Sequence, residues 1–318
     1  MKSGVLVVDK PRGLTSHDAV ARVRRTLGMR EVGHAGTLDP MATGVLVVAV
    51  GEATKLVPWL TAQDKTYEAT IALGVETDTL DADGREVVQV PPSDELRAAL
   101  VGSAKGLAIA ATIDAALASE RSRNSQVPPS FSAIKHEGER AYARARRGEQ
   151  TVLVARAVKV RHLDLIACRD QPASVDLRLQ VGKGYYVRAL ARDLAAALGT
   201  VGHLTHLRRT QSGPFGCEEA VALDASTEEL LAGMCALPLA AARALPTVHL
   251  TDAGAKDARH GRRVLARDIL GFVAGPSAWI DPLGDLVAVG EVDETGGKVT
   301  RGFGRPTSIG SPSSGLSP

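Results

Sequence analysis

Gly33-His-Ala-Gly-Thr-Leu-Asp-Pro-Met-Ala-Thr-Gly44 carries the sharpest local signal in this chain. It places a histidine, a proline and one carboxylate, that of Asp39, among three glycines and between apolar runs. Because Pro40 biases the preceding residue away from helical backbone angles, the segment is predicted to be a loop. Loops held by a rigid scaffold often carry catalytic groups, so Asp39 is a catalytic candidate. The alternatives are an Asx turn for Asp39 and a structural hydrogen bond for His34.

Strand and helix patterns surround this loop. Apolar or alternating runs predict strands at residues 4–9, 44–50, 67–73, 152–165 and 175–181. Helices are predicted at residues 18–27, after a Thr15 or Ser16 cap, at 94–118, and at 186–198 before Gly199. Residues 78–84 are interpreted as a polar turn and residues 121–129 as an exposed loop. This mixture fits an α/β or α+β domain with a sizeable sheet.

Composition limits the function classes without choosing one. The chain has 318 residues, 44% of them hydrophobic, so it can bury a substantial core. A net charge of +2 is too small to indicate a nucleic-acid binder by itself. The three cysteines, Cys168, Cys217 and Cys235, lack metal-ligand spacing and are interpreted as reduced thiols of a cytoplasmic protein. No secretory signal or membrane span is expected, because Asp114 interrupts the most apolar stretch, residues 107–118.

A second unit is predicted near the C-terminus. Residues 245–303 contain strand-like runs at 277–281 and 286–290, and their number suits an independent domain. Residues 304–318 are mostly Ser, Gly and Pro and are predicted to be a disordered tail. The sequence shows no internal repeat.

One candidate site combines a glycine-flanked turn with a basic helix. In Gly182-Lys-Gly-Tyr-Tyr-Val-Arg-Ala-Leu-Ala-Arg-Asp193, Arg188 and Arg192 are four residues apart and would share a helix face. An arginine there could pair with a loop carboxylate or hold a phosphate. The alternative interpretation is an ordinary solvated face.

A longer basic stretch spans residues 121–147. Its arginines outnumber its carboxylates, and Phe131 and Tyr142 lie among them. Phosphates attract such stretches, and aromatic rings can stack on exposed bases. Arg140, Arg144 and Arg147 are therefore predicted to form an RNA-binding patch, with a solvated face as the alternative.

Several familiar motifs are absent from the sequence. Residues 79–84 resemble the start of a calcium-binding loop, but Val90 stands where the bidentate glutamate is needed. There is no GxxxxGK[ST] phosphate loop, no HExxH zinc motif and no GxSxG nucleophile elbow. Nucleotide, metal and serine-hydrolase chemistry therefore lack support, and no metal or cofactor is expected.

Taken together, these segments resemble one family, the bacterial tRNA pseudouridine-55 synthases. The resemblance covers about residues 4–216. Its motifs occur in the family's order: Gly4-Val-Leu-Val-Val-Asp-Lys-Pro-Arg-Gly-Leu-Thr-Ser16, Gly33-His-Ala-Gly-Thr-Leu-Asp-Pro40, Gly51-Glu-Ala-Thr-Lys55, Lys65-Thr-Tyr67, residues 74–84, Pro128-Pro-Ser-Phe-Ser-Ala-Ile-Lys135, Gly184-Tyr-Tyr-Val-Arg188 and Leu207-Arg-Arg209. A chance match of this ordered set is implausible, so it outweighs the alternatives above.

The resemblance implies an α+β pseudouridine synthase fold, in which helices and loops flank a central mixed, largely antiparallel sheet. It implies a catalytic domain over residues 1–240, with an RNA-gripping insertion at about 85–150. The C-terminal unit, residues 245–303, more weakly resembles a small β-rich PUA-type RNA-binding domain. The stretch from 101 to 126 is longer and richer in alanine than the family's usual connection, although Gln126 and Pro128 still match.

The resemblance also implies residue roles. Asp39 matches the catalytic aspartate, Tyr67 the tyrosine that stacks under the target base, and Arg188 the arginine that pairs with the aspartate. Leu207 matches an apolar residue of the base pocket. Four further positions are expected to contact the substrate or support the site: His34, Lys55, Gly36 and Thr37.

The implied reaction isomerises uridine 55 in the T-loop of tRNA after base flipping, with no cofactor and no obligate protein partner. A cytoplasmic monomer is expected. Attack of the carboxylate at C6 of the base, attack at C1′ of the ribose, and stabilisation of an oxocarbenium-like state all stay open. Two alternatives remain: an RNA-folding helper whose catalysis is secondary, and a guide-RNA-dependent synthase that shares the catalytic core.

Overall fold

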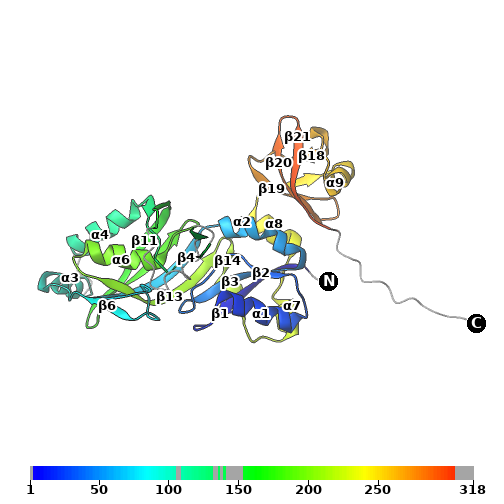
Figure 1. The fold of residues 1–318 in the computed structure, drawn as a ribbon. Coiled ribbons are helices and arrows are strands. Elements are labelled where there is room, and N and C mark those ends of the chain that lie inside the picture. Colours follow the sequence, from blue (N-terminus) through cyan, green and yellow to red (C-terminus); the bar gives the residue numbers. More distant parts are fainter. Residues whose placement is uncertain (1–2, 105–108, 132–134, 137–138, 141–152, 305–318) are drawn as a thin grey trace, which may run out of the picture.

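The fold combines one large sheet, covered by helices, with a small C-terminal β-rich module. The computed structural model describes residues 3–104, 109–131, 135–136, 139–140 and 153–304. In Figure 1 the C-terminal strands stand beyond one end of the large sheet, next to α2 and α8. The predicted tail beyond Gly304 lies outside the described residues.

The large sheet contains strands distributed over residues 4–236. Its ten strands are β1 (Gly4–Lys10), β2 (Val32–His34), β3 (Thr43–Val50), β4 (Lys65–Leu73), β11 (Val160–Asp170), β12 (Ala173–Val181), β13 (Gly202–Ser212), β14 (Phe215–Gly216), β15 (Val221–Ala222) and β16 (Cys235–Ala236). The main order is β11-β12-β4-β13-β3-β1-β15. Within the described part of this sheet only the β13–β3 and β1–β15 pairs are parallel, so the predicted mixed, largely antiparallel sheet is confirmed.

Helices cover this sheet and connect its strands. They are α1 (Ser16–Leu27), α2 (Val57–Ala62), α3 (Asp94–Ala104), α4 (Ala111–Arg121), α6 (Val187–Ala197), α7 (Thr227–Ala232), α8 (Leu237–Ala244) and the short 3-10 turns η1 (Gly51–Leu56) and η2 (Cys217–Glu219). Of the two predicted caps, Thr15 and Ser16, the first caps α1, through a reciprocal capping box with Asp18. The single helix predicted over 94–118 is wrong, because α3 ends at Ala104 and α4 begins at Ala111. None of the described helices is long and apolar enough to cross a membrane.

Three two-stranded sheets and the C-terminal module complete the described chain. The two-stranded sheets pair β5 (Val75–Thr77) with β6 (Glu86–Gln89), β7 (Ser125–Gln126) with β10 (Arg156–Ala157), and β8 (Lys135–His136) with β9 (Glu139–Arg140). The C-terminal module contains α9 (Asp252–Arg259), η3 (Ala266–Asp268) and five strands, β17 (Thr247–Leu250), β18 (Ile269–Leu270), β19 (Pro276–Ile280), β20 (Leu286–Asp293) and β21 (Gly296–Gly302). These strands fall within the predicted C-terminal unit; its likeness to a PUA domain stays a prediction.

The apolar runs of β1 and β3 are buried on both faces of the sheet. On one face Leu6 and Leu46 join a core that includes Val20 and Val23 of α1. On the other face a second core extends to the C-terminal module through Phe303. Strands covered on both faces need continuous rather than alternating apolar sequence, which is the pattern of residues 4–9 and 44–50. This double burial fixes the strands that flank the candidate catalytic loop.

Gly44 allows β3 to approach β13 closely. Its φ is +97°, and a Cβ at this position would lie 2.2 Å from the carbonyl oxygen of Arg209. Gly44→Ala is therefore expected to lower the free energy of unfolding by about 2–4 kcal/mol, from backbone strain and overpacking together. Urea denaturation would measure this. Gly33→Ala is the control, because its Cβ would meet no atom within 4 Å; an equal loss in both variants would contradict the explanation.

Candidate active site

Asp39 lies in the loop between β2 and β3, and residues of the N-terminal motif hold this loop in place. The Leu38 amide donates to Ser16 Oγ at 2.8 Å, and Ser16 Oγ donates back to the Leu38 carbonyl at 3.1 Å. The buried Lys10 ammonium donates to the Pro40 carbonyl at 3.3 Å and to two carbonyls of its own segment. Burial lowers the pKa of Lys10 to about 8. The first strand and helix therefore position the loop from both sides of Asp39.

Arg188, in the first turn of α6, binds the carboxylate of Asp39 through two hydrogen bonds. Nε donates to Oδ2 at 2.9 Å and Nη2 donates to Oδ1 at 3.2 Å. The guanidinium also donates to the carbonyls of Thr79, at 3.0 Å, and Phe131, at 2.9 Å. Such a bidentate pair fixes orientation as well as charge. The Arg188 side chain is 8% exposed and that of Asp39 is 33% exposed. The guanidinium therefore holds the carboxylate on its buried side, and its other side is accessible.

Asp81 is a second carboxylate at this guanidinium, and sequence reasoning missed it. Its Oδ2 lies 3.6 Å from Arg188 Nε. Burial raises its pKa, while a hydrogen bond from Thr79 Oγ1, at 2.6 Å, and the charge of Arg188 act in the opposite direction. The sequence signal was present, because Asp81 falls in the matched segment 74–84, but residues 78–84 were interpreted as a polar turn and as an incomplete calcium-binding loop. Arg188 therefore lies between two carboxylates, of which Asp81 is buried and Asp39 is one-third exposed.

Tyr67 on β4 and Leu207 on β13 form the floor in front of Asp39. The two strands are neighbours, with Tyr67 opposite Arg209 and Ala69 opposite Leu207. Both side chains point to the same face of the sheet and are almost fully buried. Together with the catalytic loop and the start of α6 they enclose a cavity of about 250 Å³. Six of the predicted site residues line it: Asp39, Tyr67, Arg188, Leu207, Gly36 and Thr37.

The cavity wall also contains buried cations that had no predicted role. Arg209 is 1% exposed and donates to the carbonyls of Val45 at 2.7 Å and Gly36 at 3.1 Å. Lys65 donates to the carbonyls of Thr61 at 2.6 Å and Gln63 at 2.5 Å. Both belong to matched motifs, but the resemblance assigned them no function. Arg209 supports the loop backbone near Asp39, Lys65 holds the backbone just before β4, and both give the cavity a positive side.

Comparison with known proteins identifies the family of this chain. Residues 24–187 match the model of the TruB family pseudouridylate synthase N-terminal domain, and residues 188–233 match the tRNA pseudouridylate synthase B C-terminal domain. A relative from Arthrobacter sp. (strain FB24), named tRNA pseudouridine synthase B, is 45% identical over 91% of this chain and 92% of its own length. The chain belongs to the TruB family of pseudouridylate synthases. A relative from Thermobifida fusca with the same name is 46% identical over 92% of this chain and 95% of its own.

Solved structures agree with the TruB-family fold. A Cbf5-Nop10-Gar1 complex contains a chain that is 26% identical, with a TM-score of 0.69 over 94% of this chain and 84% of the other. A chain in an H/ACA RNP bound to a substrate RNA is 23% identical, with a TM-score of 0.66 over the same shares, and shows likeness of fold alone. The predicted pseudouridine synthase fold is therefore confirmed. The protein is an isomerase of the pseudouridine synthase class.

Gln126 positions the helix that carries Arg188 in this TruB-family protein. Its side-chain Oε1 accepts from the Tyr186 amide at 2.9 Å, and Nε2 donates to the Tyr186 carbonyl at 3.1 Å. Tyr186 is the residue before the first turn of α6. Gln126 is 2% exposed, so the prediction of an exposed loop over 121–129 is wrong at this position. The segment is held in place because the side-chain amide of Gln126 forms hydrogen bonds with backbone groups at the N-terminal end of α6.

His34 lies outside the cavity lining of the TruB-family site. Its ring packs edge-on against His17, with 5.2 Å between ring centroids, and its buried Nδ1 has no hydrogen-bond partner among the described residues. Burial, followed by the charges of His17 and Arg209, lowers the pKa of His34 to about 4. The ring is therefore neutral near pH 7. Its contact with substrate stays a prediction.

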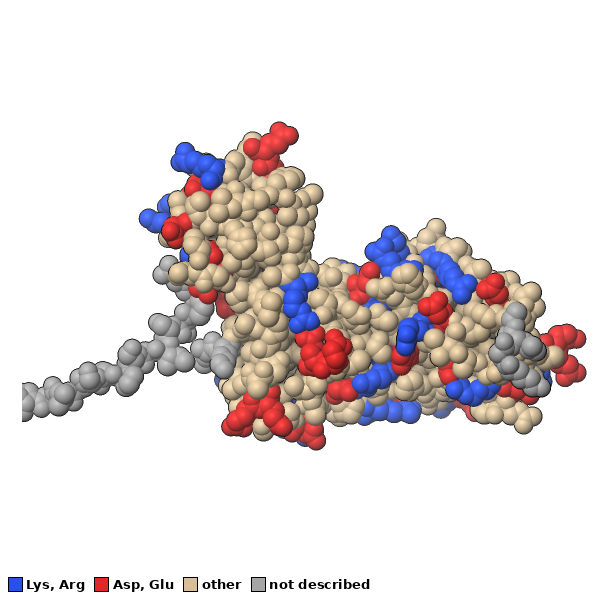
Figure 2. Space-filling model, turned by 180° about the vertical axis from the view of Figure 1, so that it is seen from behind, with Lys and Arg blue, Asp and Glu red and all other residues tan. Residues whose placement is uncertain are grey.

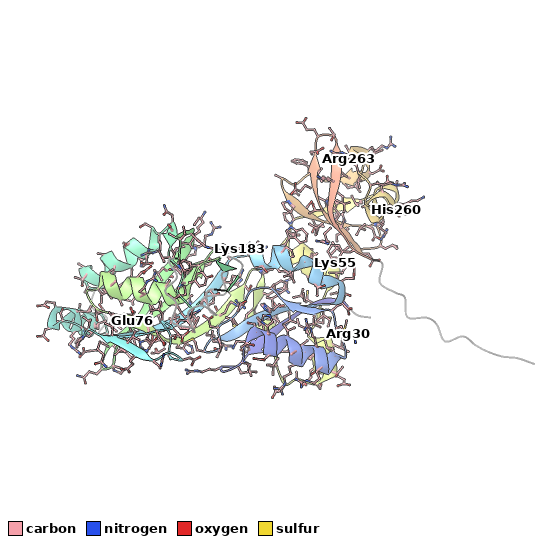
Figure 3. The ribbon with its side chains drawn as sticks, viewed as in Figure 1. Arg30, Lys55, Glu76, Lys183, His260 and Arg263 are labelled. Atoms are coloured by element: carbon pink, nitrogen blue, oxygen red, sulfur yellow. The ribbon has the colours of Figure 1, made fainter. Side chains whose placement is uncertain are left out.

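Lys55 lies at the junction with the C-terminal module and does not line the cavity. Its Nζ is 2.6 Å from Glu52 Oε2 and donates to the Gly302 carbonyl at 3.3 Å. It also lies 5.7 Å from the centroid of the Phe303 ring. Figure 3 shows Lys55 beneath the module and apart from Lys183, a residue that lines the cavity. These contacts link the two units, and the predicted substrate contact of Lys55 stays a prediction.

The predicted RNA-binding patch is largely beyond the described chain. Arg144 and Arg147 lie outside the described residues, and Arg140 is described only as the end of β9. On the face shown in Figure 2, Lys and Arg side chains lie among Asp and Glu side chains, so that face presents no broad field of one sign. The patch therefore stays a prediction.

Proposed function

We propose that this enzyme converts uridine 55 in the T-loop of tRNA to pseudouridine, with Asp39 as the nucleophile and the target base flipped out of its loop. The observation that carries the proposal is the Asp39–Arg188 pair at the open side of a cavity floored by Tyr67 and Leu207. The relatives named tRNA pseudouridine synthase B support tRNA as the substrate.

The size of the cavity supports base flipping. At about 250 Å³ it lies near the small end of ligand sites, so it suits one nucleoside and not a paired stack. Enzymes that act on a base inside a folded nucleic acid extrude it into such a pocket. Tyr67 offers an aromatic face for stacking, and Leu207 an apolar wall.

The geometry also supports a division of roles. The reaction breaks the bond between N1 and C1′, rotates the uracil, joins C5 to C1′, and transfers the C5 proton away while N1 gains one. Asp39 supplies the carboxylate that attacks C6 or C1′, or stabilises the oxocarbenium-like state. Arg188 fixes the direction of that carboxylate. The Tyr67 hydroxyl is the candidate to move a proton, because it lines the same cavity.

The proposal is tested with unmodified tRNA and the purified chain alone. We expect pseudouridine at position 55, detected by sequencing-based mapping, and none in a transcript that carries cytidine at that position. Activity without other proteins or RNA would exclude a guide-dependent synthase. Pseudouridine at a different position, or only when a guide RNA is added, would contradict the proposal. The predicted monomeric state and cytoplasmic location stay predictions.

A further inference from the structure

The floor of the cavity is divided into an apolar half and a cationic half. Lys65 and Tyr67 are two residues apart on β4, and Leu207 and Arg209 are two apart on β13, so all four side chains point to one face. The Arg209 position is directly opposite Tyr67. Tyr67 and Leu207 therefore form one half, and Lys65 and Arg209 the other. The proposed function uses only the apolar half, for the base.

The cationic half has more positive charge than its surroundings neutralise. Among the described lining residues, four cations face one carboxylate: Lys65, Lys183, Arg188 and Arg209 against Asp39. Asp39 is already paired with Arg188, and Asp64, the acidic neighbour of Lys65, is paired with Arg161 at 3.0 Å. Lys65, Arg209 and Lys183 have no ion pair within the described part of the chain. Buried charges without a counter-charge are costly and therefore unusual unless a ligand provides one.

Two of these cations, Lys65 and Arg209, lie next to Gly36. A Cβ built on Gly36 would lie 3.6 Å from Lys65 Cε and 3.7 Å from Arg209 Nη1. Burial first, and then the charge of Arg209, lowers the pKa of Lys65 to about 8, with Lys183 adding to the effect. An ammonium has three donors, and carbonyls occupy two of those of Lys65. One donor remains for a ligand in the cavity. Lys183 is exposed and also lines the cavity, so it completes this side.

We propose that Lys65 and Lys183 form a phosphate subsite that holds one of the two phosphodiesters flanking the flipped uridine. Arg209 supports the subsite from below through its positive charge. A nucleotide carries its base and its phosphate at opposite ends of the ribose, which matches the two halves of the floor. Phosphate contacts fix register and orientation rather than sequence, so this subsite would set how far the target nucleotide enters. The inference rests on the proposed function and adds the anchor that positions the nucleotide over Asp39.

A chemical double-mutant cycle tests the subsite. T-arm hairpins are made with a single neutral methylphosphonate on the 5′ or the 3′ side of the target uridine. Their dissociation constants and single-turnover rates are measured with the wild-type chain, with Lys65→Met and with Lys183→Met. Methionine keeps most of the unbranched side chain and removes the charge. Lys159→Met is the matched control, because Lys159 is exposed nearby and does not line the cavity.

At one of the two linkages we expect the methylphosphonate to weaken wild-type binding about 10-fold or more, as for a lost charge-assisted hydrogen bond. The same methylphosphonate should weaken binding by about threefold or less in Lys65→Met or Lys183→Met, because its partner is already absent there. In Lys159→Met it should weaken binding as much as in the wild type. An undiminished penalty in both lysine variants, or no penalty at either linkage, would overturn the subsite. Failure of the proposed function appears separately, as wild-type enzyme that forms no pseudouridine in the unmodified hairpin. Even without pseudouridine formation, the dissociation constants show whether the phosphate subsite exists.

Discussion

Asp39→Asn is expected to lower the single-turnover rate of pseudouridine formation by about 10⁴-fold or more, the scale seen when a nucleophile is removed. Asparagine has nearly the same shape as aspartate but is a poor nucleophile and carries no charge to stabilise an oxocarbenium-like state. It also places an amide where Arg188 now donates to a carboxylate. Because the carboxylate is one-third exposed and the fold around it is held by other contacts, the variant should stay folded and bind tRNA.

The control for this variant is Asp176→Asn. Asp176 also makes a bidentate pair, with Arg169, at 2.9 and 2.5 Å. Its strand partner is Thr70, which points away from the cavity face, since it alternates with Tyr67 and Ala69 along β4. Single-turnover mapping and binding are measured for both variants. Activity of Asp39→Asn within tenfold of wild type would remove Asp39 from the chemical step.

Arg188→Met is expected to lower the free energy of unfolding by about 3 kcal/mol near neutral pH and to abolish activity. Removal of one partner from a buried ion pair leaves an uncompensated buried charge, which costs about 3–5 kcal/mol. We expect the low end of this range because only one of the two carboxylates left without a partner is buried. Asp81 is 7% exposed, whereas Asp39 is 33% exposed and solvent screens its charge. Urea denaturation at several pH values measures the loss.

The pH dependence and a double variant identify the cause. Burial already raises the pKa of Asp81, and loss of the guanidinium would raise it further. As pH falls through that raised pKa, the native state binds a proton that the unfolded state does not bind, so the deficit of Arg188→Met should shrink in acid. Asp81→Asn combined with Arg188→Met should recover at least half of the lost stability. A deficit that is the same at every pH and unchanged in the double variant would contradict this account.

Local sequence pattern determined much of the fold. The apolar runs of β1 and β3, the alternation of β4 and the cap at Thr15 specify their elements because they depend on residues close in sequence. The division of residues 94–118 into two helices was not predicted, because the many alanine and leucine residues were given more weight than Gly102 and Gly106, which disfavour helix near the end of α3. Gln126 was assigned to an exposed loop because the residue that its side chain binds, Tyr186, is 60 residues away, and local sequence does not reveal such a contact.

The candidate site divides in the same way. The sequence by itself predicted which residues carry the proposed chemistry: Asp39, Tyr67 and Arg188 stand in motifs whose order identifies the family. Only the tertiary structure decided that Arg188 also contacts Asp81, that Lys65 and Arg209 flank Gly36, and that Lys55 lies against the C-terminal module. These facts depend on strand register and on contacts between distant segments. A motif records which side chains are present, whereas their shared electrostatics depends on distances that only the folded chain sets.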